Sequence, residues 1–339
     1  MIQNKKAVVL VNVGSPDQPK VKYVRKYLTE FLNDRRVIDL PLILQKFLVN
    51  FIIIPFRKRN STRLYKRLWT DEGSPLIFIQ QKVTNELNKI LGDEYEVISA
   101  MRYGNPSFKK ILNQLEKEKY SEIIIVPLYP QYASSTTGSV VQLSMKKIQH
   151  WEVIPKVSFI DQFYYSDVFI NAFVERAQQY NLNDFDHFIF SYHGLPDRHI
   201  HKTHPSISIG KCNCTEKMPE HGTYCYKATC YETTRLLVKR LNIPPHKYTV
   251  SFQSRLSKNW LTPFTNEILV EKAKTGLKNI MVFCPAFVTD CLETIIEIDY
   301  EYKELFENNG GENLTMVESL NDLQIWIEGL KTLILNQYE

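Results

Sequence analysis

The sequence lacks the motifs that define several large classes of protein. None of its 12 glycines forms the GxGxxG pattern of dinucleotide-binding folds, and no GxxxxGK[ST] phosphate-binding loop occurs. Only 12 Gly and 16 Pro occur among 339 residues and 44% of the residues are hydrophobic, so the composition excludes the disordered and fibrous classes. We therefore expect a globular protein that uses no nucleotide cofactor.

The sequence also has little excess charge and no long apolar run. The 42 Lys and Arg against 37 Asp and Glu leave a net charge of +5, which is too weak to predict nucleic-acid binding. The longest apolar stretch, residues 40–56, is interrupted by polar residues and two prolines, so it is too broken to span a bilayer. Residues 1–14 show no signal-peptide cleavage pattern, so we expect a cytoplasmic protein.

Cysteine is scarce, but four of the six cysteines crowd into one short segment. Their spacing is C-x-C, ten residues, C, four residues, C, which differs from the paired CxxC of zinc ribbons. Four thiolates at this spacing suit one zinc ion or a [2Fe–2S] cluster. Four flanking histidines also allow a zinc site with mixed ligands. Four unrelated thiols are the alternative. The residues are Cys212, Cys214, Cys225 and Cys230, with His199, His201, His204 and His221.

The hydrophobic pattern alternates short β-branched runs with longer amphipathic ones, which is typical of βαβ units around parallel sheets. The predicted strands are 7–13, 95–100, 122–128, 152–159, 186–192, 247–252, 279–284 and 314–318. The predicted helices include 20–32, 80–91, 108–118, 166–180, 230–241, 263–275, 289–308 and 322–337.

This order of elements predicts an α/β protein with two lobes, each a four-stranded parallel sheet flanked by helices. We expect an N-terminal lobe over residues 1–165 that carries the apolar stretch 40–56. A C-terminal lobe over 166–320 carries the cysteine-rich insertion 198–230, and residues 321–339 form a final helix that packs back on the lobes.

A histidine stands where the fifth predicted strand ends. Functional residues in open α/β sheets gather beyond the carboxyl ends of the strands, and His193 follows such a strand and precedes a Gly-Leu-Pro turn. Imidazole accepts a proton near neutral pH, so His193 is a candidate general base. The alternative is a hydrogen-bonded histidine that only holds the turn.

A row of carboxylates follows the seventh strand. Asp290, Glu293, Glu297, Glu301 and Glu304 are spaced by three or four residues, which places them on one face of one predicted helix. Like charges at this spacing repel one another, and a divalent cation or a proton relieves the repulsion. The row is therefore a candidate path for a metal ion or protons, and a solvated acidic face is the alternative.

Aromatic rings and a cation follow strands of the first half. Trp69, Arg102, Tyr103, Tyr129 and Tyr132 together suit a planar, apolar ligand that bears carboxylates, because the arginine fork matches carboxylate geometry. Ordinary packing at the edge of a core is the alternative.

The stretch 40–56 is followed by Arg57, Lys58 and Arg59. A helix here places Ile43, Phe47, Phe51 and Ile54 on one stripe. Either the helix is buried, or it is an apolar lip that enters the membrane interface while the cations meet anionic headgroups.

Motifs along nearly the whole chain resemble those of ferrochelatases. They are LVNVGSP at 10–16, LWT and GSPL within 68–76, MRYG at 101–104, PLYPQY at 127–132, SSTTG at 134–138, HGLP at 193–196, SFQSR at 251–255 and DCLET at 290–294. The resemblance implies two Rossmann-like lobes of the chelatase type. It also implies that the enzyme, a lyase, inserts Fe²⁺ into a porphyrin, the last step of haem synthesis, without a nucleotide or redox cofactor.

The resemblance also assigns roles to residues. It implies that His193 is the active-site histidine, Glu293 its partner carboxylate, and Asp290 and Glu297 part of the acidic path that handles the substrate iron. The predicted porphyrin-binding residues are Asn12, Trp69, Arg102, Tyr103, Tyr129 and Ser135.

Two features refine this expectation. The insertion 198–230 resembles that of ferrochelatases with an internal four-cysteine [2Fe–2S] cluster, and zinc remains the alternative. The apolar lip favours protoporphyrin IX over coproporphyrin III and peripheral contact of residues 40–59 with the inner face of the cell membrane. Another tetrapyrrole chelatase or a non-enzymatic metal-binding protein that uses the cysteine loop are the rival functions, and a monomer and a homodimer are both open.

Overall fold

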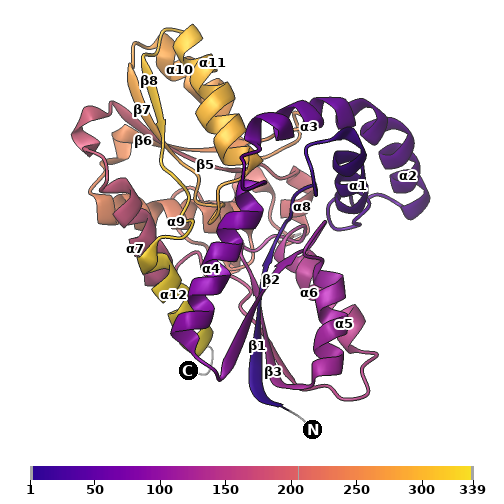
Figure 1. Cartoon of the computed structure of the whole chain (residues 1–339). Helices are drawn as coiled ribbons and strands as arrows, with labels where there is room; N and C mark the ends of the chain where they lie inside the picture. The colour runs from indigo at the N-terminus through magenta and orange to yellow at the C-terminus, as the bar shows by residue number, and fades with distance from the viewer. Residues whose placement is uncertain (1–2, 205, 337–339) are drawn as a thin grey trace. The chain divides into compact units, whose positions relative to one another are not determined.

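The computed structural model describes residues 3–204 and 206–336. Parts of three predicted segments, at residues 1–2, 205 and 337–339, lie outside the described residues. The described chain contains two four-stranded sheets, ordered β2-β1-β3-β4 and β6-β5-β7-β8, in which every pair of neighbours is parallel (Figure 1). This confirms the predicted α/β fold with two four-stranded parallel sheets flanked by helices.

The strands lie close to their predicted positions. They are β1 (Gln3–Asn12), β2 (Tyr95–Met101), β3 (Tyr120–Pro127), β4 (Lys156–Phe159), β5 (His187–His193), β6 (Tyr248–Gln253), β7 (Asn279–Phe283) and β8 (Asn313–Met316). The α-helices are α1 (Val21–Leu32), α2 (Leu42–Phe47), α3 (Ile54–Leu68), α4 (Pro75–Leu91), α5 (Phe108–Glu118), α6 (Thr137–Ile148), α7 (Asp167–Ala177), α8 (Asp197–His201), α9 (Tyr226–Leu241), α10 (Thr265–Lys274), α11 (Lys303–Asn308) and α12 (Gln324–Leu335). Two π-helices, η1 (Leu48–Ile53) and η6 (Leu292–Tyr302), run directly into α3 and α11, and the short 3₁₀ turns are η2 (Leu182–Asp184), η3 (Ile209–Lys211), η4 (Glu220–Gly222) and η5 (Pro245–Lys247).

The first compact unit contains the chain up to Tyr129, residues 133–162 and the chain from Gln324 onward. Its central strand β1 is apolar on both faces, as expected for a parallel strand that helices cover on both sides. Alternate residues Ala7, Val9 and Val11 belong to one buried cluster with α5 and α6. Helices α4 and α12 lie on the opposite side of the sheet (Figure 1).

The second compact unit contains residues 130–132 and 163–323. One face of its sheet packs against α10, α11 and the π-helix η6, through a buried cluster that includes Ile189, Val282, Ile298 and Phe306. Helices α7 and α9 pack against each other on the other side (Figure 1). Because β5, β6 and β7 are parallel, their carboxyl ends lie at the same edge of this sheet. The start of η6 lies next to this edge, where Gln253 of β6 contacts Glu293.

Two predicted helices differ from the structure. The helix predicted over 289–308 starts only at Leu292 and begins as the π-helix η6. The apolar stretch is interrupted in the same way, because η1 separates α2 from α3. A π-helix has a wider turn than an α-helix, so a face that is read from the sequence with 3.6 residues per turn changes direction within it.

Candidate active site

His193 is the last residue of β5, and its Cα is in register with that of Gln253, the last residue of β6. Gly194 follows, and its N–H donates to the Gln253 carbonyl at 2.8 Å. A Cβ on Gly194 would stand 2.7 Å from that carbonyl oxygen, so only glycine fits this close approach of the two strands. The turn thus fixes the backbone that carries the histidine.

The surroundings of His193 leave one nitrogen of its ring unpaired among the described residues. The Tyr226 hydroxyl donates to the His193 carbonyl oxygen at 2.9 Å, and the Phe287 ring meets the imidazole edge-on at 6.3 Å between centroids. The Nδ1 atom is buried and has no hydrogen-bond partner in the part of the chain that the structure describes. A buried ring nitrogen without a partner is an exception in folded proteins and calls for a functional explanation.

Glu293 lies in the first turn of η6. The helix begins with a reciprocal cap, in which the Cys291 side chain and backbone pair with Thr294. Gln253 ties this turn to the sheet, because its Nε2 donates to the Glu293 carbonyl oxygen at 2.8 Å while its Oε1 accepts from the Ser191 hydroxyl at 2.8 Å. The Gln253 side chain therefore connects three elements: β5, which ends at His193, its own strand β6, and the helix η6 that carries Glu293.

Glu297 is surrounded by donors. Its carboxylate accepts from the Ser254 backbone N–H at 2.7 Å, the Ser254 hydroxyl, the Tyr302 hydroxyl at 2.8 Å and Gln253 Nε2 at 3.3 Å. Burial and the Glu297 charge raise the pKa of Tyr302, which keeps this phenol a donor. Glu297 is therefore held in place by the protein.

Asp290 has different surroundings, which correct the prediction of one acidic face. It precedes η6 and is buried, with Asn321 Nδ2 donating to its Oδ2 at 2.6 Å and the Ser319 N–H donating to its Oδ1 at 3.3 Å. Asp290 does not share a helical face with the other four carboxylates, because the helix starts after it, at Leu292. Only Glu293 and Glu297 combine a position near the sheet edge with partial exposure and a link to Gln253.

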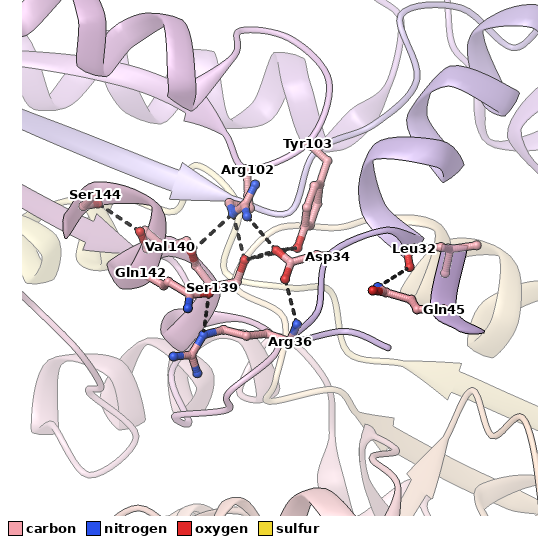
Figure 2. Close-up of polar contacts among 10 residues, drawn as sticks. All are labelled: Leu32, Asp34, Arg36, Gln45, Arg102, Tyr103, Ser139, Val140, Gln142 and Ser144. Carbon is pink, nitrogen blue, oxygen red and sulfur yellow. Dashed lines mark hydrogen bonds and ion pairs between the residues drawn. The ribbon is translucent and has the colours of Figure 1, made fainter. Parts of the chain in front are cut away.

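The predicted porphyrin-binding residues all lie in the first unit. Arg102 and Tyr103 follow β2, and the side chains of both contact the Asp34 carboxylate, as Figure 2 shows. Asn12 ends β1 and accepts from the N–H of Val13 at 2.8 Å. Trp69, Tyr129 and Ser135 are partly buried, and burial raises the pKa of Tyr129. Four of these six residues follow strand ends of the first sheet, Asn12 is the last residue of β1, and Trp69 follows α3.

A family model for ferrochelatase matches residues 5–338 of the chain. The chain belongs to the ferrochelatase family. A ferrochelatase of Legionella pneumophila (strain Lens) is 40% identical over 335 residues, which are 98% of this chain and 100% of the relative. A ferrochelatase of Coxiella burnetii (strain Dugway 5J108-111) is 38% identical over 332 residues, 96% of this chain and 92% of the relative. Ferrochelatase is a lyase that acts in haem synthesis and takes ferrous iron and a porphyrin as substrates, so this assignment confirms the predicted family and type of enzyme.

Solved structures support the fold. The structure of SirB from Bacillus subtilis with Fe³⁺ matches with a TM-score of 0.54, at 11% identity over 98% of this chain and 97% of that one. The sirohydrochlorin chelatase SirB from Bacillus subtilis subspecies spizizenii, in complex with cobalt, matches with a TM-score of 0.53 at 12% identity. At this identity the likeness concerns the fold alone, and it confirms the chelatase-like architecture of this ferrochelatase-family chain.

The cysteine-rich segment of this family member buries all four of its thiols, at Cys212, Cys214, Cys225 and Cys230. Cys225 Sγ lies 3.2 Å from His204 Nε2, and Cys212 Sγ lies 3.4 Å from His221 Nε2. Burial, together with the neighbouring Cys212 and Cys225, raises the pKa of Cys214 to about 12 against the opposing charge of Lys227. Over residues 3–204 and 206–336, no three His, Cys, Asp or Glu side chains are arranged so that they could hold a metal ion as they stand.

The apolar stretch exposes most of its large side chains. Ile43, Phe51 and Phe56 are 86%, 70% and 77% exposed, and the Phe47 and Phe51 rings pack 5.6 Å apart. Ile54 is only 3% exposed, so its predicted place on the exposed stripe is wrong, because the wide turn of η1 rotates it toward the core. No helix in the described part of the chain is long and apolar enough to cross a membrane.

Sequence reasoning missed several residues that build these sites. Gln253 and Ser254 appeared only as a motif after the sixth strand, yet they hold Glu297 and the start of η6. Asp34 and Ser139 were not singled out, although they contact Arg102. A buried polar residue at a strand end was the available signal for Gln253, whereas Asp34 follows α1 and Ser139 lies in α6, where no such signal exists.

Proposed function

We propose that this chain inserts Fe²⁺ into protoporphyrin IX and releases two protons, which forms protohaem. The observation that carries the proposal is His193 at the carboxyl end of β5, with a buried Nδ1 that no described residue hydrogen-bonds, in a chain of the ferrochelatase family. A ring nitrogen that the protein leaves unpaired can exchange a proton with a substrate.

The chemistry balances as a proton-for-metal exchange. The free-base porphyrin carries two pyrrole N–H protons, and both must leave as Fe²⁺ takes the four nitrogens. Neutral His193 accepts one pyrrole proton and becomes an imidazolium, passes this proton to water, and then accepts the second pyrrole proton in the same way. A bent macrocycle turns the nitrogen lone pairs out of its plane toward the metal, so a site that favours the bent form lowers the barrier.

The carboxylates of η6 support this transfer in different ways. Glu293 follows the same sheet edge as His193, and its negative charge stabilises the imidazolium. Glu297 stands one helical turn further on and is held by Ser254 and Tyr302, which suits an oxygen ligand that passes iron in or protons out. Asp290 has a structural role in this proposal, because its hydrogen bonds with Asn321 fix the loop that leads into η6.

The proposal of protoporphyrin IX instead of coproporphyrin III rests on the exposed apolar residues of α2 and η1. Such a surface suits an enzyme that binds an apolar substrate. Side-by-side turnover with protoporphyrin IX and coproporphyrin III, followed by fluorescence loss with Fe²⁺ or Zn²⁺ under anaerobic conditions, tests it. We expect kcat/KM for protoporphyrin IX to exceed that for coproporphyrin III by about tenfold, since two additional carboxylates must be desolvated.

Equal or reversed preference would contradict the choice of porphyrin and favour coproporphyrin III. Loss of fluorescence with neither porphyrin would contradict the enzyme and favour a metal-binding protein that uses the cysteine loop. Turnover only with another tetrapyrrole, or only with cobalt or nickel, would point to a different chelatase on this fold.

We also infer that the cysteine-rich segment binds a metal through thiolates, as a [2Fe–2S] cluster or as zinc. Four buried thiols occur between residues 212 and 230, and burial disfavours a free thiolate at each site whose pKa is raised. A bound metal compensates that cost, because thiolates are its preferred soft ligands. His204 and His221, each next to one thiol, give the zinc alternative two imidazole donors.

Anaerobically purified protein is expected to contain either two iron atoms with visible absorption or one zinc per chain, as a cluster or a zinc site requires. Cys214→Ser should remove the metal, whereas Cys284→Ser, which alters a buried thiol outside the segment, should retain it. Elemental analysis and absorption spectra decide between the two metals. Wild-type protein that carries neither, after expression with iron and zinc supplied, would contradict the inference.

We further propose that residues 40–59 contact the membrane surface. The exposed Ile43, Phe47, Phe51 and Phe56 provide apolar area next to the cations Arg57, Lys58 and Arg59. Such a combination binds anionic bilayers by shallow insertion and by attraction to the headgroups.

Cosedimentation with vesicles of phosphatidylglycerol and phosphatidylcholine tests this surface. Replacing Phe51 and Phe56 by Ser should weaken binding at least about tenfold, because each buried phenylalanine contributes about 1.5–3 kcal/mol. Leu256→Ser, a change at an equally exposed apolar side chain elsewhere, should leave it unchanged. Equal binding of all three proteins, or no binding of the wild type, would contradict the proposal.

A further inference from the structure

Asp34 lies just beyond the end of α1 and is the centre of a polar cluster in the first unit (Figure 2). Its Oδ2 accepts hydrogen bonds from Arg102 Nη2 at 2.6 Å, the Ser139 hydroxyl at 2.6 Å and the Tyr103 hydroxyl at 2.9 Å. Its Oδ1 accepts from the Arg36 N–H at 2.8 Å. The Asp34 side chain is only 7% exposed.

These contacts keep a buried carboxylate charged. Burial by itself raises the pKa of Asp34, but the Ser139 hydroxyl, the Arg36 N–H, the Arg102 charge and the Tyr103 hydroxyl together lower it below its ordinary value. A buried ion pair is a costly way to stabilise a fold, since apolar residues of the same volume do it equally well. The cluster therefore calls for a role other than stability.

The cluster also fixes one edge of the Arg102 guanidinium, which carries Nε and Nη2, and leaves Nη1 without an acceptor among the described residues. Nε donates to the Ser139 hydroxyl at 2.8 Å and Nη2 donates to Asp34, while the Tyr103 ring lies 4.6 Å from the guanidinium carbon. Nη1 has no acceptor among the described residues, and the Arg102 side chain is 18% exposed. A guanidinium held on one edge presents its remaining N–H groups in a fixed direction, which suits a carboxylate.

A second contact fastens the Asp34 segment to the loop that precedes α6. Arg36 Nη1 donates to the Ser134 hydroxyl at 2.8 Å and its Nε donates to Gln142 Oε1 at 3.0 Å. Ser134 lies beside Ser135 of the predicted porphyrin-binding set. The short segment from Asp34 to Arg36 thus connects the end of β2, the loop at 134–135 and the first turns of α6.

We propose that Asp34 is a positioning residue for the substrate: it holds Arg102 and Tyr103 so that the free Nη1 edge of Arg102 receives a carboxylate of the porphyrin. The inference rests on the proposed function, because it takes the anionic porphyrin as the ligand. Ser139 completes the device, since its hydroxyl accepts from Arg102 and donates to Asp34. Asp34 itself does not touch the substrate.

A double-mutant cycle tests this role. We expect Asp34→Asn and Arg102→Gln each to raise the KM for protoporphyrin about tenfold with kcat lowered less than threefold. Because Asp34 acts through Arg102, the double variant should be no worse than Arg102→Gln within about twofold. Asp93→Asn, a change at an exposed aspartate before the amino end of β2, is the matched control and should leave KM unchanged.

The outcomes separate the inference from the function on which it rests. If the wild type does not metallate porphyrin, the proposed function fails. If the wild type is active and Asp34→Asn has the wild-type KM, or the double variant shows the product of the two single effects, the positioning role is overturned.

Ser139→Ala provides an independent test should Asp34→Asn fail to fold. This variant removes one bond to Arg102 and one to Asp34 but keeps the ion pair. A three- to tenfold increase in KM, matched by weaker porphyrin binding in fluorescence titrations without metal, supports the role. An unchanged KM overturns it.

Discussion

Replacing His193 by alanine is expected to lower metal insertion at least about 10³-fold while porphyrin binding stays within about threefold of the wild type. The size follows from general-base catalysis, which contributes about 10²–10⁴-fold. Binding persists because the predicted porphyrin-binding residues lie in the other unit, at the strand ends of the first sheet. In the proposed mechanism the imidazole acts on the pyrrole protons, so its loss should affect kcat rather than KM.

Stopped-flow or steady-state fluorescence with Zn²⁺ and protoporphyrin measures kcat, and titration without metal measures binding. His246→Ala is the matched control, because His246 is exposed in the same unit, just before the amino end of β6. We expect this control to retain wild-type turnover. Turnover of His193→Ala within tenfold of the wild type would show that another group takes the proton.

Replacing Glu293 by glutamine is expected to lower kcat about 10²-fold with little loss of stability. The change keeps the shape of the side chain and removes the charge that, in the proposed mechanism, stabilises the imidazolium. The Cys291 thiol, a weak donor, hydrogen-bonds to the Glu293 carboxylate, and a glutamine amide oxygen can still accept this bond; the Glu293 backbone carbonyl keeps the bond from Gln253. We therefore expect the free energy of unfolding to change by less than about 0.5 kcal/mol.

The same substitution at Glu297 should also lower the stability of the fold. Comparing the two variants therefore separates the effect of losing a charge from the effect of losing hydrogen bonds. The Glu297 carboxylate accepts from Ser254, Tyr302 and Gln253, and a glutamine amide would face two of these donors with its own N–H groups. Glu297→Gln should therefore lower the free energy of unfolding by about 2 kcal/mol, since hydrogen bonds to charged groups contribute about 1.5–3 kcal/mol.

Thermal unfolding and kcat measured on both variants decide this point. An equal loss of stability in the two proteins would show that Glu293 also has a structural role. A Glu293→Gln variant with wild-type kcat would remove Glu293 from the proposed chemistry and leave His193 without a carboxylate partner.

The sequence predicted the sheets well because local pattern determines them. Strands such as β1 and β3 are continuous β-branched runs, and burial on both faces of a parallel sheet demands such runs. Helix boundaries were less accurate. Nothing in the composition of residues 289–308 distinguishes a π-helix from an α-helix. The residues that bind Glu293 and Glu297, which are Gln253 and Ser254, stand 40 or more positions earlier in the chain.

By itself, the sequence determined the fold class, the strand ends where chemistry gathers, and His193 and Glu293 as the residues to test, since motifs and hydrophobic period are local properties. Only the tertiary structure decided which polar groups are satisfied. It paired Asp290 with Asn321, held Glu297 with three residues, left His193 Nδ1 without a partner among the described residues and placed Asp34 against Arg102. These outcomes depend on contacts between distant segments, and burial gives each such contact its energetic weight.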